Sequence, residues 1–135
     1  MKTYLDQYQQ QIEPKLHAID LFIKTNPPPY SVSQTAQLLH LSEQEVEKIM
    51  QEENFDSICQ HTFFTIMQKG SSPICQIFAR ELKCGTPRVY SVEHISYIYN
   101  LNIFDVIDAA KKMGVSTFTT SMTKHLFQLI PPHQP

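Results

Sequence analysis

The stretch YSVSQTAQLLHLSEQEVEKI, residues 30–49, decides the fold. Ser31 is a suitable N-cap for a first helix, and Ser42 with Glu45 forms a Ser-x-x-Glu capping box for a second helix. Between the two helices the chain must turn at His40, and histidine tolerates the left-handed backbone region better than most residues. These features predict two short helices, over about 32–39 and 42–52, joined by a tight turn. Their inner faces should meet at small and apolar side chains: Ala36, Leu38, Leu41, Val46 and Ile49.

A diverged copy begins sixty residues later as YSVEHISYIYNLNIFDVIDAAKKMGV, residues 90–115. Laid over residues 30–55 without gaps, it matches at five of 26 positions. The substitutions keep the local chemistry. His40 becomes Asn100, which also tolerates the left-handed region, Asn102 is the second N-cap, and Gly114 stops the helix. Such a repeat indicates one supersecondary unit used twice.

The N-terminal segment 3–25 has an apolar stripe at spacings of three and four, which is typical of one amphipathic helix. Pro14 can kink this helix, because proline removes a backbone hydrogen bond. The stripe can pack on the rest of the chain or on a second copy. Residues 26–29 then form a stiff, proline-rich spacer. The stripe consists of Leu5, Tyr8, Ile12, Leu16, Ile19 and Ile23.

Two segments leave strand and helix both open, because short apolar runs are ambiguous. Segments 57–60 and 63–68 predict a small hairpin, and a helix over 56–69 ended by Gly70 competes with it. In the tail, a hairpin of 115–119 with 124–129 competes with a short helix over 120–130.

A helix over 73–84 is expected between these two segments. Ser72 is its N-cap, Pro73 is its first residue, and Gly85 follows its end. The spacing places Arg80 and Lys83 on its outer face. Its inner face should carry Ile74, Ile77, Phe78 and Leu82.

The composition fits a globular, mainly helical chain. Of 135 residues, 41% are hydrophobic and 18% are charged, so the chain can build a core. No apolar run approaches the roughly 20 residues of a membrane span. The N-terminus has no apolar signal-peptide core, so we expect a cytoplasmic protein that does not associate with a membrane. The three cysteines are odd in number, which argues against a disulfide framework.

The sequence offers no cofactor or catalytic motif. It contains no glycine-rich phosphate loop, no Gly-x-Ser-x-Gly and no His-Glu-x-x-His. Cys59, His61, Cys75 and Cys84 could supply four zinc ligands. Their spacing is not a standard one, however, and cysteine is a common core residue. We therefore expect no enzymatic activity, no cofactor and no metal.

The buried pattern of residues 30–84, and more loosely of 86–130, resembles the helix-turn-helix superfamily, in its winged, excisionase-like and MerR-like branch. The resemblance implies a mainly α fold of tandem helix-turn-helix units with a small β-hairpin wing, preceded by the N-terminal amphipathic helix. It implies three segments: 1–29, a first winged unit over 30–85, and a second unit with the tail over 86–135. In that superfamily the second helix of each unit enters the major groove, which points to 42–52 and 102–113.

The two candidate groove-reading helices differ in the charge of the part of the chain to which they belong. Residues 1–59 carry four lysines against nine acidic side chains, whereas residues 60–135 carry seven basic and four acidic ones. Because phosphate contacts depend on Lys and Arg, the acidic helix 42–52 is a poor groove reader. Contacts to nucleic acid are therefore expected from the second half. The candidate residues are Lys69, Arg80, Lys83, Arg88, Asn102, Lys111, Lys112 and Lys124.

A DNA-binding regulatory protein acting on double-stranded DNA is the leading hypothesis. The alternative is a protein-interaction adaptor built from degenerate helix-turn-helix units, which binds a protein partner or a second copy. It depends on exposed acidic and apolar side chains, because apolar groups exposed together usually mark an interface. The candidate interface residues are Glu43, Glu47, Ile103, Phe104 and Ile107.

Overall fold

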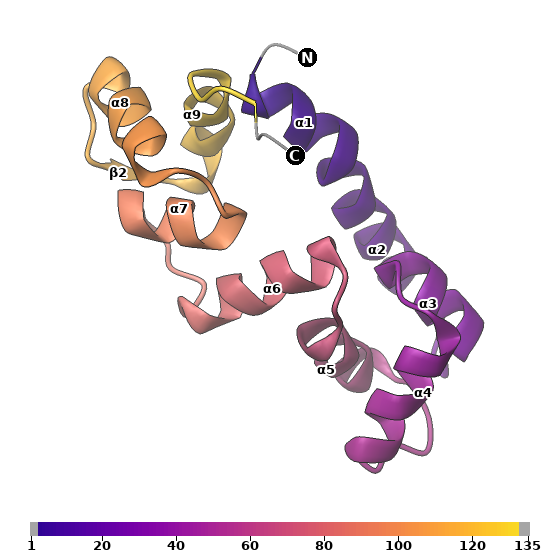
Figure 1. Ribbon diagram of the computed structural model, residues 1–135. Helices are drawn as coiled ribbons and strands as arrows, with labels where there is room; N and C mark the ends of the chain where they lie inside the picture. Colours follow the sequence, from indigo (N-terminus) through magenta and orange to yellow (C-terminus); the bar gives the residue numbers. More distant parts are fainter. Residues whose placement is uncertain (1–2, 133–135) are drawn as a thin grey trace. The chain divides into compact units, whose positions relative to one another are not determined.

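The computed structural model describes residues 3–132 and is mainly helical, with a small two-stranded antiparallel sheet (Figure 1). The chain divides into two compact units. The central unit comprises Pro14–Ala79, and the terminal unit comprises Met1–Glu13 with Arg80–Pro135. These boundaries differ from the three segments expected from the sequence, because they fall within two helices, α2 (Glu13–Thr25) and α6 (Pro73–Lys83). Each unit is described by itself.

The central unit contains most of α2, the start of α6, and three further helices between them. Its core includes Leu39, Val46 and Phe63, all fully buried. A single antiparallel bridge joins Tyr30 to Ile58, and the backbone N–H of Tyr30 donates to the Ile58 carbonyl at 2.8 Å. The three helices are α3 (Val32–Leu39), α4 (Glu43–Glu52) and α5 (Gln60–Lys69).

The turn between α3 and α4 is formed as predicted. His40 adopts the left-handed conformation, with φ 57° and ψ 43°. The Leu41 N–H then donates to the Ala36 carbonyl at 2.9 Å, and the Ser42 hydroxyl accepts from the Glu45 N–H at 3.1 Å. The predicted capping box is only half made, because the Glu45 carboxylate accepts from Ser71 instead. The inner face also uses Leu39, which is fully buried, in place of the half-buried Leu38.

The hairpin expected at 57–60 and 63–68 is wrong, because this segment forms α5. The competing helix is confirmed, with a later start, and Gly70 follows its end. Helical spacing buries Phe63, Ile66 and Met67 together, and this packing overrides their strand propensity. The segment therefore contains no wing.

The terminal unit combines both ends of the chain. The Tyr4 N–H donates to the Ile130 carbonyl at 2.8 Å, and the Tyr4 and Tyr99 rings both contact Phe127, with centroids 4.9 and 5.0 Å apart. The sheet pairs Tyr90 with Phe118. The elements are α1 (Tyr4–Gln11), β1 (Tyr90–Ser91), α7 (Val92–Tyr99), α8 (Ile103–Met113), β2 (Thr117–Phe118), the 3-10 helix η1 (Thr120–Met122) and α9 (Thr123–Gln128).

The internal repeat is visible in the backbone and extends beyond its detectable sequence match. Tyr30 pairs with Ile58 in the central unit, and Tyr90 pairs with Phe118 in the terminal unit. Each residue of the second pair lies sixty positions after its equivalent in the first. The left-handed turn residue His40 likewise corresponds to Asn100. The second helix of each pair is followed by a residue of positive φ, which is Asn54 in one unit and Gly114 in the other. One gapless offset therefore relates residues 30–58 to 90–118.

The predicted N-terminal helix is divided at Ile12, whose φ of −113° ends α1 before α2 begins. Pro14 accounts for the division, because it cannot donate a helical hydrogen bond and is tolerated only in the first turn of a new helix. In the tail, the hairpin of 115–119 with 124–129 is also wrong. Only Thr117–Phe118 forms a strand, and it pairs with β1, whereas α9 confirms the alternative short helix.

Two side chains of α6 lie opposite to their predicted faces. Arg80 is half-buried, and its Nε donates to the Ile98 carbonyl at 2.8 Å. Leu82 is 37% exposed instead of facing inward. Periodicity fails here because this end of α6 packs in the terminal unit while its start packs in the central unit.

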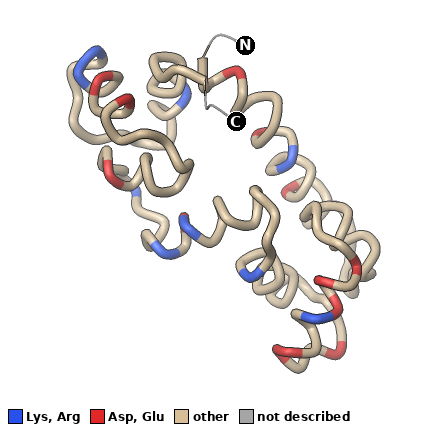
Figure 2. Tube along the Cα trace, in the orientation of Figure 1, with Lys and Arg blue, Asp and Glu red and all other residues tan. Residues whose placement is uncertain are grey.

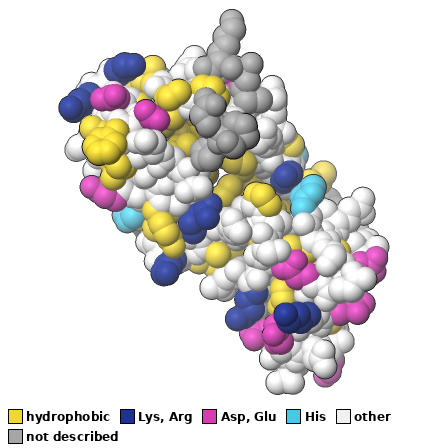
Figure 3. Space-filling model, viewed as in Figure 1, with side chains coloured by type: hydrophobic (Ala, Val, Ile, Leu, Met, Phe, Trp, Pro, Cys, Tyr) yellow, Lys and Arg dark blue, Asp and Glu magenta, His cyan; other side chains and the backbone are white. Residues whose placement is uncertain are grey.

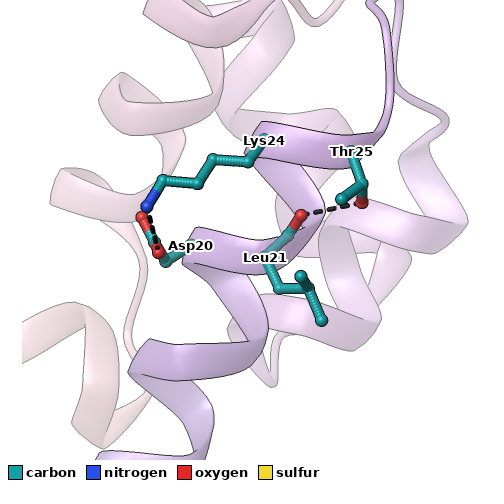
Figure 4. A network of polar contacts seen from close by, with 4 residues as sticks. All are labelled: Asp20, Leu21, Lys24 and Thr25. Atoms are coloured by element: carbon teal, nitrogen blue, oxygen red, sulfur yellow. Dashed lines mark hydrogen bonds and ion pairs between the residues drawn. The ribbon is translucent and has the colours of Figure 1, made fainter.

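Side chains in the last two turns of α2 make two local contacts (Figure 4). The Thr25 hydroxyl donates to the Leu21 carbonyl at 2.8 Å, and Lys24 pairs with Asp20 at 2.9 Å. The Thr25 hydroxyl thus finds its acceptor one turn earlier in the same helix.

Among residues 3–132, no helix combines the length and the apolar character needed to cross a membrane.

Candidate functional site

Helix α8 presents an apolar surface to solvent. It starts at Ile103 because the Asn102 side chain accepts from the Phe104 N–H at 2.8 Å. Val106, Ala109 and Ala110 are buried on its inner side. Phe104 lies on the other side and is 73% exposed, with Ile103 and Ile107 partly exposed beside it. We call Ile103, Phe104, Ile107, Asp108 and Lys111 the α8 outer face.

Charged groups of both signs border these apolar side chains. Asp105 and Asp108 lie in the first two turns of α8, and Lys111 and Lys112 lie in its last turn (Figure 2). Where α8 lies, Figure 3 shows hydrophobic, acidic and basic side chains next to one another. An amphipathic surface of this kind suits a protein partner better than a phosphate backbone, because carboxylates repel phosphate.

The internal repeat supplies a control for the α8 outer face. The equivalents of Ile103, Phe104 and Ile107 in α4 are Glu43, Gln44 and Glu47, and all three are exposed. The buried position Val106 keeps its identity as Val46, and both valines are fully buried. The two helices therefore share the inner valine but differ at the outer positions, and packing within the unit does not explain Phe104, which is 73% exposed.

A hollow of about 640 Å³ lies between α3 and α4 in the central unit. Ser33 and Gln37 line it from α3, and Glu43, Gln44 and Glu47 line it from α4. Neither carboxylate has an ion-pair partner among residues 3–132. The predicted interface residues Glu43 and Glu47 thus lie together at one exposed, acidic hollow.

Four of the eight predicted nucleic-acid contacts are engaged within the protein. The Arg80 side chain donates a hydrogen bond to the Ile98 carbonyl near the end of α7, and the Asn102 side chain caps α8. Lys124 pairs with Glu13 at 2.7 Å, and Lys69 lies 3.8 Å from Glu53. The sequence predicted the cap at Asn102, but spacing could not reveal the partners of Arg80 and Lys124, because these two meet theirs through tertiary packing.

The other four cations are Lys83, Arg88, Lys111 and Lys112. None of their side chains has an ion-pair or hydrogen-bond partner in the described part of the chain, and all four belong to the terminal unit. Lys111 and Lys112 also lie favourably at the negative end of the α8 dipole. The terminal unit as a whole is nearly balanced, with seven basic and six acidic side chains.

The cysteines do not form a cluster. Cys59 is exposed at the N-cap of α5, where the Thr62 hydroxyl bonds to it and lowers the pKa of its thiol. Cys75 is buried, and its burial raises the pKa of its thiol. Between residues 3 and 132, no group of three or more His, Cys, Asp or Glu side chains could hold a metal ion.

Comparison of the chain with protein-family models, with curated proteins and with solved structures finds no match.

Proposed function

We propose that the chain is a non-enzymatic adaptor of the cytoplasm, built from two degenerate helix-turn-helix units, that binds a protein through the α8 outer face. The observation that carries this proposal is the exposure of Phe104, 73%, at a position where the repeat-equivalent helix has Gln44. Aromatic side chains are enriched at interfaces, where burying one contributes a large share of the binding energy.

Contact with a partner would remove the Phe104 ring from water. An exposed phenylalanine of this kind contributes about 1.5–3 kcal/mol when it is fully buried. Ile103 and Ile107 extend the apolar surface on either side of it, and the charged groups of α8 form a polar rim. This arrangement matches the usual anatomy of an interface, an apolar centre within a polar border.

The experiment is an affinity capture from native lysate with the wild-type chain and two variants. Phe104→Asp places a charge in the centre of the α8 outer face, and it should abolish the specific partner. Gln44→Asp introduces the same side chain at the equivalent position of α4 and should leave capture unchanged. If Phe104→Asp retains every protein that the wild-type chain captures, the proposal fails. Circular dichroism of both variants checks that the chain remains folded.

Binding to double-stranded DNA is the second candidate function. It is favoured by Lys83, Arg88, Lys111 and Lys112, which have no partner among residues 3–132. Against it, the candidate groove-reading helix α4 is acidic and α8 exposes apolar side chains. A shift assay with random duplex fragments tests it. DNA binding that weakens steeply with salt, and that Lys111→Glu with Lys112→Glu reduces, would support it. The absence of a shift at low salt would exclude it.

A further inference from the structure

We propose that the partner of the α8 outer face is the same face of a second copy of this chain, with the two α8 helices antiparallel. This inference rests on the proposed function, because it names the occupant of that same surface. It depends on the order of charges along α8 and on the contrast between α8 and α4.

The order of charges along α8 makes the helix complementary to itself in one direction. Asp105 and Asp108 come before Lys111 and Lys112 (Figure 2). Two antiparallel copies bring the acidic part of each helix beside the basic end of the other. Two parallel copies would place like charges together. Flanking charges select partner and orientation in paired helices in this way.

The positions of the apolar side chains fit the same arrangement. A two-fold axis near Ile107 and Asp108 would place Phe104 of one copy beside Lys111 of the other. The aliphatic stem of a lysine can cover an aromatic ring while its ammonium group stays hydrated, and the ammonium group is also attracted to the ring face. Ile107, next to the axis, would then pack against its counterpart, since antiparallel helices approach to about 8–10 Å.

The equivalent surface of α4 lacks both properties. Its Glu43, Glu45 and Glu47 are followed by Lys48 and then by Glu52, so its charges are not divided between two ends. It has Gln44 where α8 has Phe104. Of the two equivalent helices, only α8 is therefore complementary to itself, and a two-fold contact through it closes at two copies rather than forming a longer assembly.

An 11-residue helix offers a small contact area. Stable specific interfaces bury about 800 Å² on each partner. We therefore expect a dimer that dissociates on dilution, with a dissociation constant on the order of micromolar.

Sedimentation of the full chain over a range of concentrations tests the proposal. The wild-type chain should shift from monomer to dimer as concentration rises. Phe104→Asp should weaken association at least about tenfold, as loss of a central interface aromatic does. Gln44→Asp should associate like the wild-type chain. A dimer that persists unchanged in Phe104→Asp would overturn the inference.

Disulfide cross-linking tests the orientation. The antiparallel arrangement brings the two copies of residue 108 close together near the two-fold axis and keeps the two copies of residue 112 apart. Asp108→Cys should therefore cross-link under mild oxidation above the background of the wild-type cysteines, whereas Lys112→Cys should not. Equal cross-linking of both variants would indicate parallel helices and contradict the antiparallel arrangement.

The outcomes for the two proposals are distinguishable. A wild-type chain that stays monomeric at every concentration, while Phe104→Asp still loses a captured protein, overturns self-association and leaves the adaptor function standing. A wild-type chain that stays monomeric and captures no protein overturns both.

Discussion

The Glu45 carboxylate accepts two hydrogen bonds from Ser71, one from the backbone N–H and one from the hydroxyl group, both at 2.9 Å. This pair joins the first turn of α4 to the segment that precedes α6. Ser72, the next residue, donates from its hydroxyl group to the Leu39 carbonyl at the end of α3, at 2.6 Å. The two adjacent serines therefore connect the start of α6 to both α3 and α4.

We expect Glu45→Ala to lower the free energy of unfolding by about 1–2 kcal/mol, because it removes a charged acceptor and leaves the Ser71 donors to water. Urea denaturation monitored by circular dichroism would measure the change. Glu47→Ala is the matched control, since Glu47 is exposed on the same helix without an ion-pair partner among residues 3–132. Equal effects of the two substitutions would show that the contact with Ser71 contributes nothing.

Gly70 allows a close approach between the end of α5 and its neighbours. A Cβ atom at this position would lie 2.7 Å from the Cys75 sulfur and 2.8 Å from a Leu41 methyl carbon. Cys75 is fully buried, so it has little room to move. We expect Gly70→Ala to destabilise the chain by about 1–3 kcal/mol through overpacking.

The comparison for this substitution is Gln68→Ala, two residues earlier on the exposed side of α5. Thermal unfolding of both variants would separate steric crowding at Gly70 from a general effect on the helix. A Gly70→Ala chain as stable as the Gln68→Ala chain would mean that Leu41 and Cys75 move aside at little cost.

The Cys59 thiol should be the most reactive of the three. The Thr62 hydroxyl bonds to its sulfur at 3.5 Å and is the main cause of its lowered pKa. Burial raises the pKa of both Cys75 and Cys84. Because the thiolate is the nucleophile, iodoacetamide near neutral pH should alkylate Cys59 first.

Thr62→Val should slow this alkylation by removing the hydroxyl group, while Thr62→Ser should retain the wild-type rate. Peptide mapping by mass spectrometry would give the order and rate at each cysteine. Preferential labelling of Cys84 would contradict the assignment.

The local parts of the fold followed from the sequence because capping and turn chemistry act over a few residues. Ser31, Ser42 and Asn102 are N-caps as predicted, and the left-handed turns fall at His40 and Asn100. The outward position of Phe104 also followed from helical spacing. These features needed no knowledge of what lies across the core.

The remaining features depend on partners far away in the chain. Strand propensity predicted a hairpin of 57–60 with 63–68, yet burial of Phe63 in the central core selects a helix. Arg80 has the spacing of a surface cation, yet it reaches the carbonyl of Ile98, 18 residues away. Lys69 and Lys124 likewise meet Glu53 and Glu13, because a residue's type and spacing do not reveal which distant group it will meet.

His40 tests whether the two repeats obey the same backbone rule. Its φ of 57° and ψ of 43° nearly equal the 55° and 49° of Asn100. We expect His40→Asn to leave the free energy of unfolding nearly unchanged, whereas His40→Val should cost about 1–2 kcal/mol, because a β-branched side chain is strained in this region. Denaturant unfolding would measure both, and equal stability of the two variants would contradict the rule.

His40→Asn should also change how the stability of the chain responds to acid. Burial, followed by the nearby positive charge of Lys15, lowers the pKa of His40 in the folded chain. The folded chain therefore binds a proton at His40 less readily than the unfolded chain does. The stability that this residue supports is complete above about pH 6.5, the ordinary pKa of histidine, and declines as the pH falls below it. Unfolding of His40→Asn should be less sensitive to pH over that range. A wild-type chain and a variant with parallel pH profiles would show that His40 has no part in the acid response.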